Sequence, residues 1–343
     1  MVRGILYAAA LVISFVATAL ILRFLIPYLK GKKMGQKILD IGPRWHKNKE
    51  GTPTMGGLSF IFAITLALLI TVPIAMHYGH ISDLTYILLA YGYGLVNGLI
   101  GIVDDRAKFK KGKNEGLTAL QKYFLQLLAA CLFLVVGIVT GMIPGSPSDT
   151  VYIPFVGNVA IFGHVAVRIL YYIFCLVLMT GMVNAVNLTD GVDGLAASVS
   201  LVVGLFFSLA TGLIASAKGG AQLLSGALVG GCGGFLVYNF HPAKVFMGDT
   251  GSLFLGGVIV ALGFMLGNPA IVLLCGGIFV LEAFSVILQV GYFKLTHGKR
   301  LFKMSPIHHH FEKCGWSEVK IVSVFSVATA LFSLLALLGC GIF

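Results

Sequence analysis

Charged residues are scarce in this sequence. Only 11% of its 343 residues are Asp, Glu, Lys or Arg, whereas 58% are hydrophobic. Soluble domains carry roughly 25% charged residues, so this composition excludes an ordinary soluble protein. Apolar stretches of about 18 residues or more recur along the chain, and each is long enough to cross a bilayer. The alternating segments of about ten residues that mark a transmembrane β-barrel are absent. The sequence therefore predicts an all-α polytopic membrane protein.

Disulfide patterns, cysteine metal sites and repeats are also missing. None of the six cysteines belongs to a CxxC pair, and most lie inside apolar runs, which favours buried thiols. No internal repeat is evident, which argues against a transporter, since many transporters are built from repeats. The first apolar run, Gly4–Leu29, is too long for a signal peptide and lacks a small-residue cleavage site. We interpret it as a helix.

Ten membrane spans are predicted, within a single integral-membrane domain over residues 1–343. Their approximate bounds are Gly4–Leu29, Met55–Met76, Leu84–Val103, Ala119–Met142, Val165–Val186, Leu195–Ser216, Ala221–Tyr238, Ser252–Leu266, Pro269–Leu295 and Val319–Ile342. An even number places both termini on the same side. Between the fourth and fifth spans, Pro144–Gly163 is expected to form an external hairpin or turn-rich loop around Val151–Val156. Pro269 and Gly276–Gly277 make the ninth span a candidate for a break.

The positive charge is distributed unevenly. A formal net charge of +11 would suit a nucleic-acid-binding protein, but 20 of the 24 Lys and Arg residues fall in four segments: Lys30–Lys49, Arg106–Lys122, Lys244 and Lys294–Lys320. These segments are alternate connections between spans, the positive-inside pattern, which places them in the cytoplasm and both termini outside. Nucleic acid is thus excluded as a partner, whereas anionic lipid or a polyphosphate fits. The predicted cytoplasmic loops are about residues 30–54, 104–118, 187–194, 239–251 and 296–318.

Acidic residues gather on the same predicted side. Of the thirteen, only Asp83 and Asp149 fall outside. Five aspartates lie at cytoplasmic ends of spans that are far apart in sequence: Asp104, Asp105, Asp190, Asp193 and Asp249. This arrangement predicts one acidic centre ringed by basic loops.

The adjacent carboxylates of Asp104 and Asp105 end the third span. Such a pair stays ionised only beside a cation, an arginine or good hydration. It is a candidate metal ligand or general base for a phosphate-bearing substrate. The alternative is a solvated helix end partnered by Arg106 and Lys108.

The polar stretch Asn184–Gly194 separates two apolar runs and offers only oxygen ligands. Mg²⁺ prefers such ligands, and its coordination is completed by water and substrate phosphates. Asn187, Asp190 and Asp193 recur at i, i+3 and i+6, so a continued helix would place them on one face. Helix capping is the alternative, although a cap needs fewer oxygens.

The connection Asn239–Ser252 holds Asp249 just before a Thr-Gly-Ser helix start. Asp249 is either an N-cap or a carboxylate held against a bound phosphate and metal. Lys244 suits a phosphate oxygen. Phe246 either stacks on a base or packs in the core, and both interpretations are open.

Three adjacent histidines, His308–His310, lie in the last basic loop. Zinc is disfavoured because neighbouring side chains splay apart and no cysteine or second histidine pair accompanies them. Hydrogen bonding to phosphates or acid–base assistance fits better, with a solvated cluster as the alternative. The loop Gly51–Gly57 is either a turn and helix start or a ligand loop. Glu282, inside the ninth span, favours a buried structural partner over catalysis.

Five strings occur in order along the chain: GTPTMGG (51–57), VDD (103–105), NAVNLTDGVDGLA (184–196), FMGDTGS (246–252) and MSPIHHHF (304–311). With them the sequence closely resembles the phospho-N-acetylmuramoyl-pentapeptide transferase family, a branch of the polyprenyl-phosphate N-acetylhexosamine-1-phosphate transferases. The resemblance covers essentially the whole chain, and the triple histidine after Ser-Pro is specific to this branch.

The resemblance implies a Mg²⁺-dependent, homodimeric enzyme of peptidoglycan (cell wall) synthesis in the bacterial inner membrane, with its active site facing the cytoplasm. Such an enzyme transfers phospho-MurNAc-pentapeptide from UDP-MurNAc-pentapeptide to undecaprenyl phosphate, giving lipid I and UMP. Direct attack by the lipid phosphate and attack through an aspartyl nucleophile both remain open, and direct attack is preferred because it needs no covalent intermediate. The alternatives are a different UDP-N-acetylhexosamine donor and, from another class, a cation-coupled transporter.

By position, the resemblance makes Asp104 and Asp105 the catalytic pair and adds Asp249 and His308 to the catalytic set. Asp249 and Asn187 are the expected Mg²⁺ contacts. The implied substrate-binding residues are Lys47 or Lys49, Thr52, Asn187, Asp190, Gly191, Val192, Asp193, Asn239, Phe246, Ser252, Gln289, His309 and His310.

Overall fold

A computed structural model describes residues 2–32, 49–81, 84–111, 116–160, 163–214 and 219–340. Ten of the helices in these ranges are long and apolar enough to cross a membrane, which confirms the predicted polytopic helical fold. The helices are α1 (Val2–Gly31), α2 (Gly57–His77), α3 (Leu84–Lys111), α4 (Ala119–Val139), α5 (Val165–Thr189), α6 (Leu195–Leu213), α7 (Gly219–Asn239), α8 (Gly248–Met265), α9 (Ile271–Cys275), α10 (Gly277–Leu295), α11 (Ile307–Lys313) and α12 (Glu318–Gly339).

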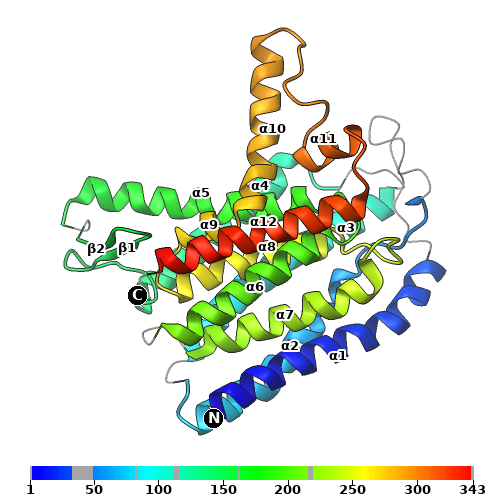
Figure 1. Cartoon of the computed structure of the whole chain (residues 1–343). Helices are drawn as coiled ribbons and strands as arrows, with labels where there is room; N and C mark the ends of the chain where they lie inside the picture. Colours follow the sequence, from blue (N-terminus) through cyan, green and yellow to red (C-terminus); the bar gives the residue numbers. More distant parts are fainter. Residues whose placement is uncertain are drawn as a thin grey trace.

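Helix α8 lies at the centre of the bundle, and sixteen of its eighteen residues are buried. It packs against α2, α3 and α5 (Figure 1). The backbones approach closely through glycines: a Cβ on Gly57 of α2 would collide with Gly251 of α8, and Gly94 of α3 lies against Gly257. Small residues allow such contacts between membrane helices. The approach determines how the polar ends of these four helices meet.

Several helices extend further into polar sequence than hydropathy predicts. Helix α3 continues to Lys111, α5 continues to Thr189, and α8 already begins at Gly248. The predicted loops 104–118, 187–194 and 239–251 are therefore too long, since backbone hydrogen bonding does not stop where the apolar sequence stops. Five candidate site residues of these three predicted loops lie inside helices: Asp104, Asp105, Asn187, Asn239 and Asp249.

The ninth predicted span is broken, as expected. The short helix α9 ends at Cys275, and Gly276 separates it from α10. Figure 1 shows α10 projecting steeply from the bundle, with α11 beside it. Helix α11 lies within the predicted loop 296–318, where we expected no helix, and it carries the three histidines.

The segment between α4 and α5 forms the expected hairpin. Strands β1 (Val151–Ile153) and β2 (Gly157–Val159) pair antiparallel, with Val151 opposite Val159. Figure 1 places both ends of the chain at the hairpin end of the bundle, away from α11. This agrees with an even number of spans, and the orientation in the membrane stays a prediction.

Candidate active site

One face of helix α3 packs against α8 and brings Asp105 to the start of α8. Gly94, Gly98 and Gly101 recur at i, i+4 and i+7 and all lie against α8. Because residues three and four apart share a helix face, Asp105 follows on the same face one turn later. It accepts hydrogen bonds from the backbone nitrogen (3.0 Å) and the hydroxyl (2.7 Å) of Thr250. Close packing of two helices thus orients this carboxylate.

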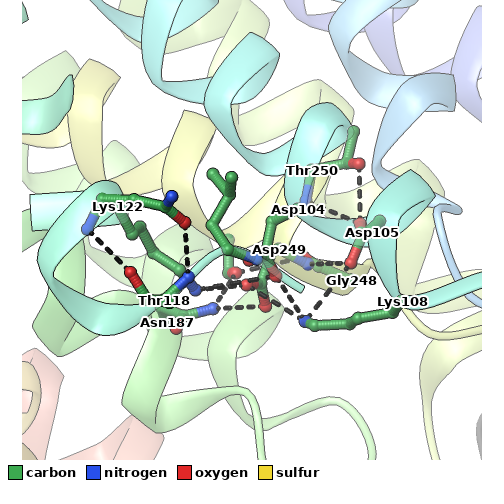
Figure 2. A network of polar contacts seen from close by, with 12 residues as sticks. Asp104, Asp105, Lys108, Thr118, Lys122, Asn187, Gly248, Asp249 and Thr250 are labelled. Carbon is green, nitrogen blue, oxygen red and sulfur yellow. Dashed lines mark hydrogen bonds and ion pairs between the residues drawn. The ribbon is translucent and has the colours of Figure 1, made fainter. Parts of the chain in front are cut away.

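Asp249, in the first turn of α8, completes an acidic cluster (Figure 2). One carboxylate oxygen from each of Asp104, Asp105 and Asp249 lies within 4.8 Å of the other two. Asp104 and Asp105 are only 1% and 2% exposed. The structure brings these three together as the sequence predicts, whereas their chemical roles stay predictions.

Two lysines that sequence reasoning did not assign to the site neutralise this cluster. The Nζ atom of Lys108 lies 2.7 Å from Asp104 Oδ2 and 3.2 Å from Asp249 Oδ2. Lys122 Nζ lies 2.5 Å from Asp249 Oδ2 (Figure 2). The i, i+4 spacing of Asp104 and Lys108 was a usable signal, but we named Lys108 only in the alternative interpretation, a solvated helix end. No local pattern indicates Lys122, because it comes from α4.

The donor set of the cluster fits a hard divalent cation. It consists of carboxylate oxygens alone, the ligands that Mg²⁺ prefers. Three carboxylates at this spacing repel one another strongly when buried, so positive charge among them is needed. The two ammonium groups supply it in the part of the chain that the structure describes.

Asn187 adjoins the cluster from α5. Its amide nitrogen donates to Asp249 Oδ1 at 3.0 Å and to the hydroxyl of Ser252 at 2.8 Å. In this orientation Asn187 supports the carboxylate, and metal coordination would require its amide oxygen instead. Its role as a magnesium ligand therefore stays a prediction.

The turn between α5 and α6 carries Asp190. Burial raises the pKa of this carboxyl group well above its ordinary value of 3.8, although part of the residue remains accessible. The negative charges of Asp249, Asp105 and Asp193 raise it further. Asp190 is thus close enough to the acidic cluster to sense its charge.

Asp193 belongs to a second charged cluster. Lys49 Nζ lies 2.7 Å from Asp193 Oδ1 and 2.6 Å from Glu318 Oε2 of α12, and His241 Nδ1 lies 3.0 Å from Asp193 Oδ2. Burial opposes ionisation of Asp193, but hydrogen bonds from Lys49, His241 and a backbone nitrogen outweigh it and lower the pKa. The predicted contact Lys47 lies outside the described residues.

The neighbouring loops hold this turn in place. Asn239 accepts a hydrogen bond from Gly194 N at 3.1 Å and donates one to the carbonyl of Val245 at 2.8 Å, so its side chain is engaged within the protein. Phe246 is half-buried, and its backbone nitrogen donates to the carbonyl of Pro53 at 2.8 Å. The loop 51–57 is thereby fixed against the start of α8.

Three further candidates for substrate binding are Thr52, Gly191 and Val192. Thr52 is half-buried and donates its N–H to the carbonyl of Lys49 at 3.1 Å. Val192 is buried, whereas Gly191 lies against the ring of His308.

A pocket of about 320 Å³ opens beside Glu318, and its lining residues are His241, Glu312, Lys313, Trp316, Ser317 and Glu318.

The three histidines of α11 have different surroundings. His308 is fully buried, and its Nδ1 lies 3.1 Å from Glu282 Oε2 of α10. His309 pairs with Glu312 at 2.5 Å. His310 accepts a hydrogen bond from the Lys303 backbone nitrogen at 3.1 Å. Adjacent positions on a short helix thus have separate contacts, and none of the metal-compatible groups among the described residues includes them.

Gln289 of α10 also contacts the last loop. Its side-chain oxygen accepts a hydrogen bond from the backbone nitrogen of Phe302 at 2.8 Å. Gln289 therefore holds the segment before α11 against α10, and a substrate contact by this residue stays a prediction.

Comparison with known proteins identifies the family. Residues 85–267 match the family model described as glycosyl transferase family 4. The chain is 45% identical over 328 residues to a phospho-N-acetylmuramoyl-pentapeptide-transferase of Caldicellulosiruptor bescii, covering 96% of this chain and 95% of that protein. The protein of the same name from Clostridium perfringens strain 13 is 45% identical over 330 residues, with 95% and 96% coverage. The one from Staphylococcus carnosus is 42% identical over 326 residues, with 95% and 97% coverage.

The chain belongs to this transferase family. Membership in the phospho-N-acetylmuramoyl-pentapeptide-transferases and the ten apolar helices together identify a multi-pass membrane transferase. The glycosyl transferase family 4 match spans α3 to α8 and so includes the acidic cluster and its two lysines. Lys49 and the histidines of α11 lie outside that match, but within a similarity that covers nearly the whole chain.

Proposed function

We propose that this protein transfers phospho-MurNAc-pentapeptide from UDP-MurNAc-pentapeptide to undecaprenyl phosphate, giving lipid I and UMP, as a Mg²⁺-dependent step of peptidoglycan synthesis. The observation that carries the proposal is the cluster of Asp104, Asp105 and Asp249 with Lys108 and Lys122 at the polar ends of membrane helices. A lipid phosphate and a water-soluble nucleotide meet only at the membrane surface, so a charged centre at helix ends suits both. We place this surface on the cytoplasmic side, as the basic loops indicate.

In this proposal Asp249 holds Mg²⁺, with Asp104 and Asp105 beside it and Asn187 as a further contact. When bound, the metal neutralises the diphosphate and stabilises the leaving phosphate of UMP. Lys108 and Lys122 orient phosphate oxygens by charge-assisted hydrogen bonds. Alignment and charge neutralisation supply most of the catalysis in phosphoryl transfer.

We assign the proton acceptor to Asp104. Asp105 is engaged by three donors from the start of α8, namely Thr250 N, Thr250 Oγ1 and Asp249 N, which suits a positioning role. Asp104 accepts one backbone hydrogen bond, from Leu117 N at 2.8 Å, and its other oxygen faces Lys108. That oxygen takes the proton of the lipid phosphate, which then attacks the sugar-linked phosphorus directly.

The two sides of the cluster suit the two halves of the nucleotide sugar. The turn of Asp190–Asp193, with Lys49 and Phe246 nearby, contacts the nucleoside in this proposal, together with Asn187 and Asn239. His308, His309, Ser252 and Gln289 contact the diphosphate and the sugar–peptide portion, and Thr52 and His310 are further substrate contacts. The enzyme acts as a homodimer in the bacterial inner membrane.

The test is UMP release by detergent-purified protein supplied with UDP-MurNAc-pentapeptide, undecaprenyl phosphate and Mg²⁺. Asp249→Ala and Asp104→Asn are expected to lower kcat by about 10²–10⁴, the range typical of lost proton transfer or charge stabilisation. A chelator is expected to abolish activity, and added Mg²⁺ to restore it. Unchanged thermal unfolding of the variants shows that folding is retained.

Two results would contradict the proposal. The first is near-wild-type turnover in either variant, since the carboxylate removed in that variant then has no part in the reaction. The second is preferential turnover of UDP-N-acetylglucosamine in the same assay, which would move the enzyme to another donor.

A further inference from the structure

Glu282 is a buried acid that the proposed mechanism does not use. It lies on the membrane-spanning helix α10 and is 0% exposed. A carboxylate at such a position is costly unless it is paired. Its ion-pair partner among the described residues is His308, whose Nδ1 lies 3.1 Å from Oε2, while Oε1 has no hydrogen-bond partner there. The pair joins α10 to α11.

His308 is oriented by this contact. The ring is 0% exposed, and the backbone nitrogen of His308 also approaches Glu282 Oε2, at 3.5 Å. On the opposite edge of the ring, Nε2 is buried and has no hydrogen-bond partner among the described residues. That atom points at Gly191, where a Cβ would collide with it. The turn that carries Asp190 and Asp193 therefore approaches the free edge of the imidazole.

We propose that Glu282 is a positioning residue that keeps a proton on His308 Nδ1 and directs Nε2 at Gly191, in the turn that the proposed function assigns to the nucleotide sugar. A carboxylate at Nδ1 accepts its hydrogen bond and fixes both the tautomer and the ring orientation. Any proton exchanged with a substrate oxygen then passes through Nε2. This inference rests on the proposed function, because only that function makes the turn at Gly191 a contact of the phosphate-bearing donor.

The other groups around His308 do not form a hydrogen bond with Nδ1 that would set its tautomer. His309 contacts its ring edge-on, with ring centroids 4.1 Å apart, but pairs with Glu312. Asp190 precedes Gly191 in the turn that lies against Nε2. Glu282 alone among the described hydrogen-bond partners contacts Nδ1.

A double-mutant cycle tests this role in the full-length protein. Glu282→Met removes the acceptor at similar size, and His308→Gln removes the imidazole. Each single change is expected to lower kcat/KM for the donor by about 10²-fold or more, as for loss of an acid–base group. In the His308→Gln background, Glu282→Met is expected to cost less than about threefold further, because groups that act as a unit are non-additive.

Three further variants sharpen the cycle. Glu282→Gln keeps an oxygen that accepts the Nδ1 hydrogen bond, so we expect it to recover most of the activity lost in Glu282→Met. Ser285→Ala is the matched control, since this hydroxyl donates to the carbonyl of Glu282 from the same helix and has no described contact with His308. It is expected to retain wild-type activity. Glu312→Gln tests the neighbouring pair and is expected to lose activity additively with His308→Gln.

A readout without turnover is the ¹⁵N resonance of the His308 ring, identified by its loss in His308→Gln. We expect a protonated Nδ1 in the wild type and in Glu282→Gln, and an unprotonated Nδ1 in Glu282→Met, because free imidazole prefers the proton on Nε2. Losses of kcat/KM that multiply in the double mutant would overturn the inference. A protonated Nδ1 in Glu282→Met would overturn it as well. Failure of the proposed function is distinct, since wild-type protein would then release no UMP.

Discussion

At the scale of single residues, Asp190 and Asp193 show how one turn shifts the pKa values of two carboxyl groups in opposite directions. They lie three positions apart, yet burial and three like charges raise the pKa of Asp190. Asp193 is buried as well, but Lys49 and His241 lower its pKa. The ionised form of Asp190 therefore destabilises the folded protein at neutral pH, whereas the ionised form of Asp193 stabilises it.

We predict opposite effects of neutralising these two residues, measured as thermal unfolding in detergent with a chelator present. Because the folded-state pKa of Asp190 is raised, its cost is fully present above that pKa and disappears as the pH falls toward 3.8. Asp190→Asn is thus expected to raise the unfolding midpoint at pH 8 and to lose this gain at low pH. The chelator matters because a bound cation would offset the repulsion.

The matched variant is Asp193→Asn. The pKa of Asp193 is depressed, so its contribution is present above the ordinary value of 3.8 and is lost only as the pH falls through the lower, folded-state pKa. We expect this variant to be less stable than the wild type at pH 8. A lower midpoint for Asp190→Asn at pH 8 would show that its charge is already compensated.

At the scale of helices, glycines determine where charged ends meet. Gly101 of α3 lies so close to α8 that a Cβ there would collide with the backbone carbonyl of Asp249. The first turn of α8 can approach Asp105 only because this side chain is absent. Gly92, on the same helix, has no atom within 4 Å of a built Cβ. The two glycines thus differ in packing alone.

We predict that Gly101→Ala separates α3 from the start of α8. Overpacking costs about 1–3 kcal/mol of stability, and a 1 Å displacement of catalytic groups lowers turnover by about 10²-fold. Gly92→Ala is the control, with wild-type turnover and a gain of about 0.5–1 kcal/mol from helix propensity. UMP release and thermal unfolding measure both variants. Equal behaviour of the two would show that close packing at Gly101 does not position Asp249.

At the scale of the whole molecule, the direction of insertion decides whether substrate reaches the site. The hairpin and both chain ends lie at one end of the bundle, and α11 lies at the other (Figure 1). The basic segments predict that α11 faces the cytoplasm. Cys314, directly after α11, is the exposed member of the six cysteines and serves as a natural reporter.

We predict that a membrane-impermeant maleimide modifies Cys314 in inverted vesicles but not in right-side-out vesicles. Cys314→Ser is expected to remove the labelling. When Ser148→Cys, at an exposed position before the hairpin, is added to Cys314→Ser, we expect labelling in right-side-out vesicles but not in inverted vesicles. Mass spectrometry of the labelled protein measures both. Labelling of Cys314 from the outer side alone would invert the proposed topology.

The sequence by itself determined the membrane class, the ten spans, the hairpin, the break in the ninth span and the family. These features depend on local sequence: the length of the apolar runs, Pro269 with Gly276–Gly277, and the motif strings. None of them requires knowledge of tertiary contacts. The convergence of Asp104, Asp105 and Asp249 also followed, because span counting places helix ends on a common side.

Only the tertiary structure decided which residues touch. It brought Lys122 to Asp249 and Glu282 to His308, and it extended the helices past the ends of their apolar sequence. The physical reason is that such contacts depend on how closely helices approach and at which angle they leave the bundle. Glycine packing around α8 controls how closely the helices approach, and the turn at Gly276 controls the angle of α10. Neither feature is visible in the sequence next to the residues that come into contact.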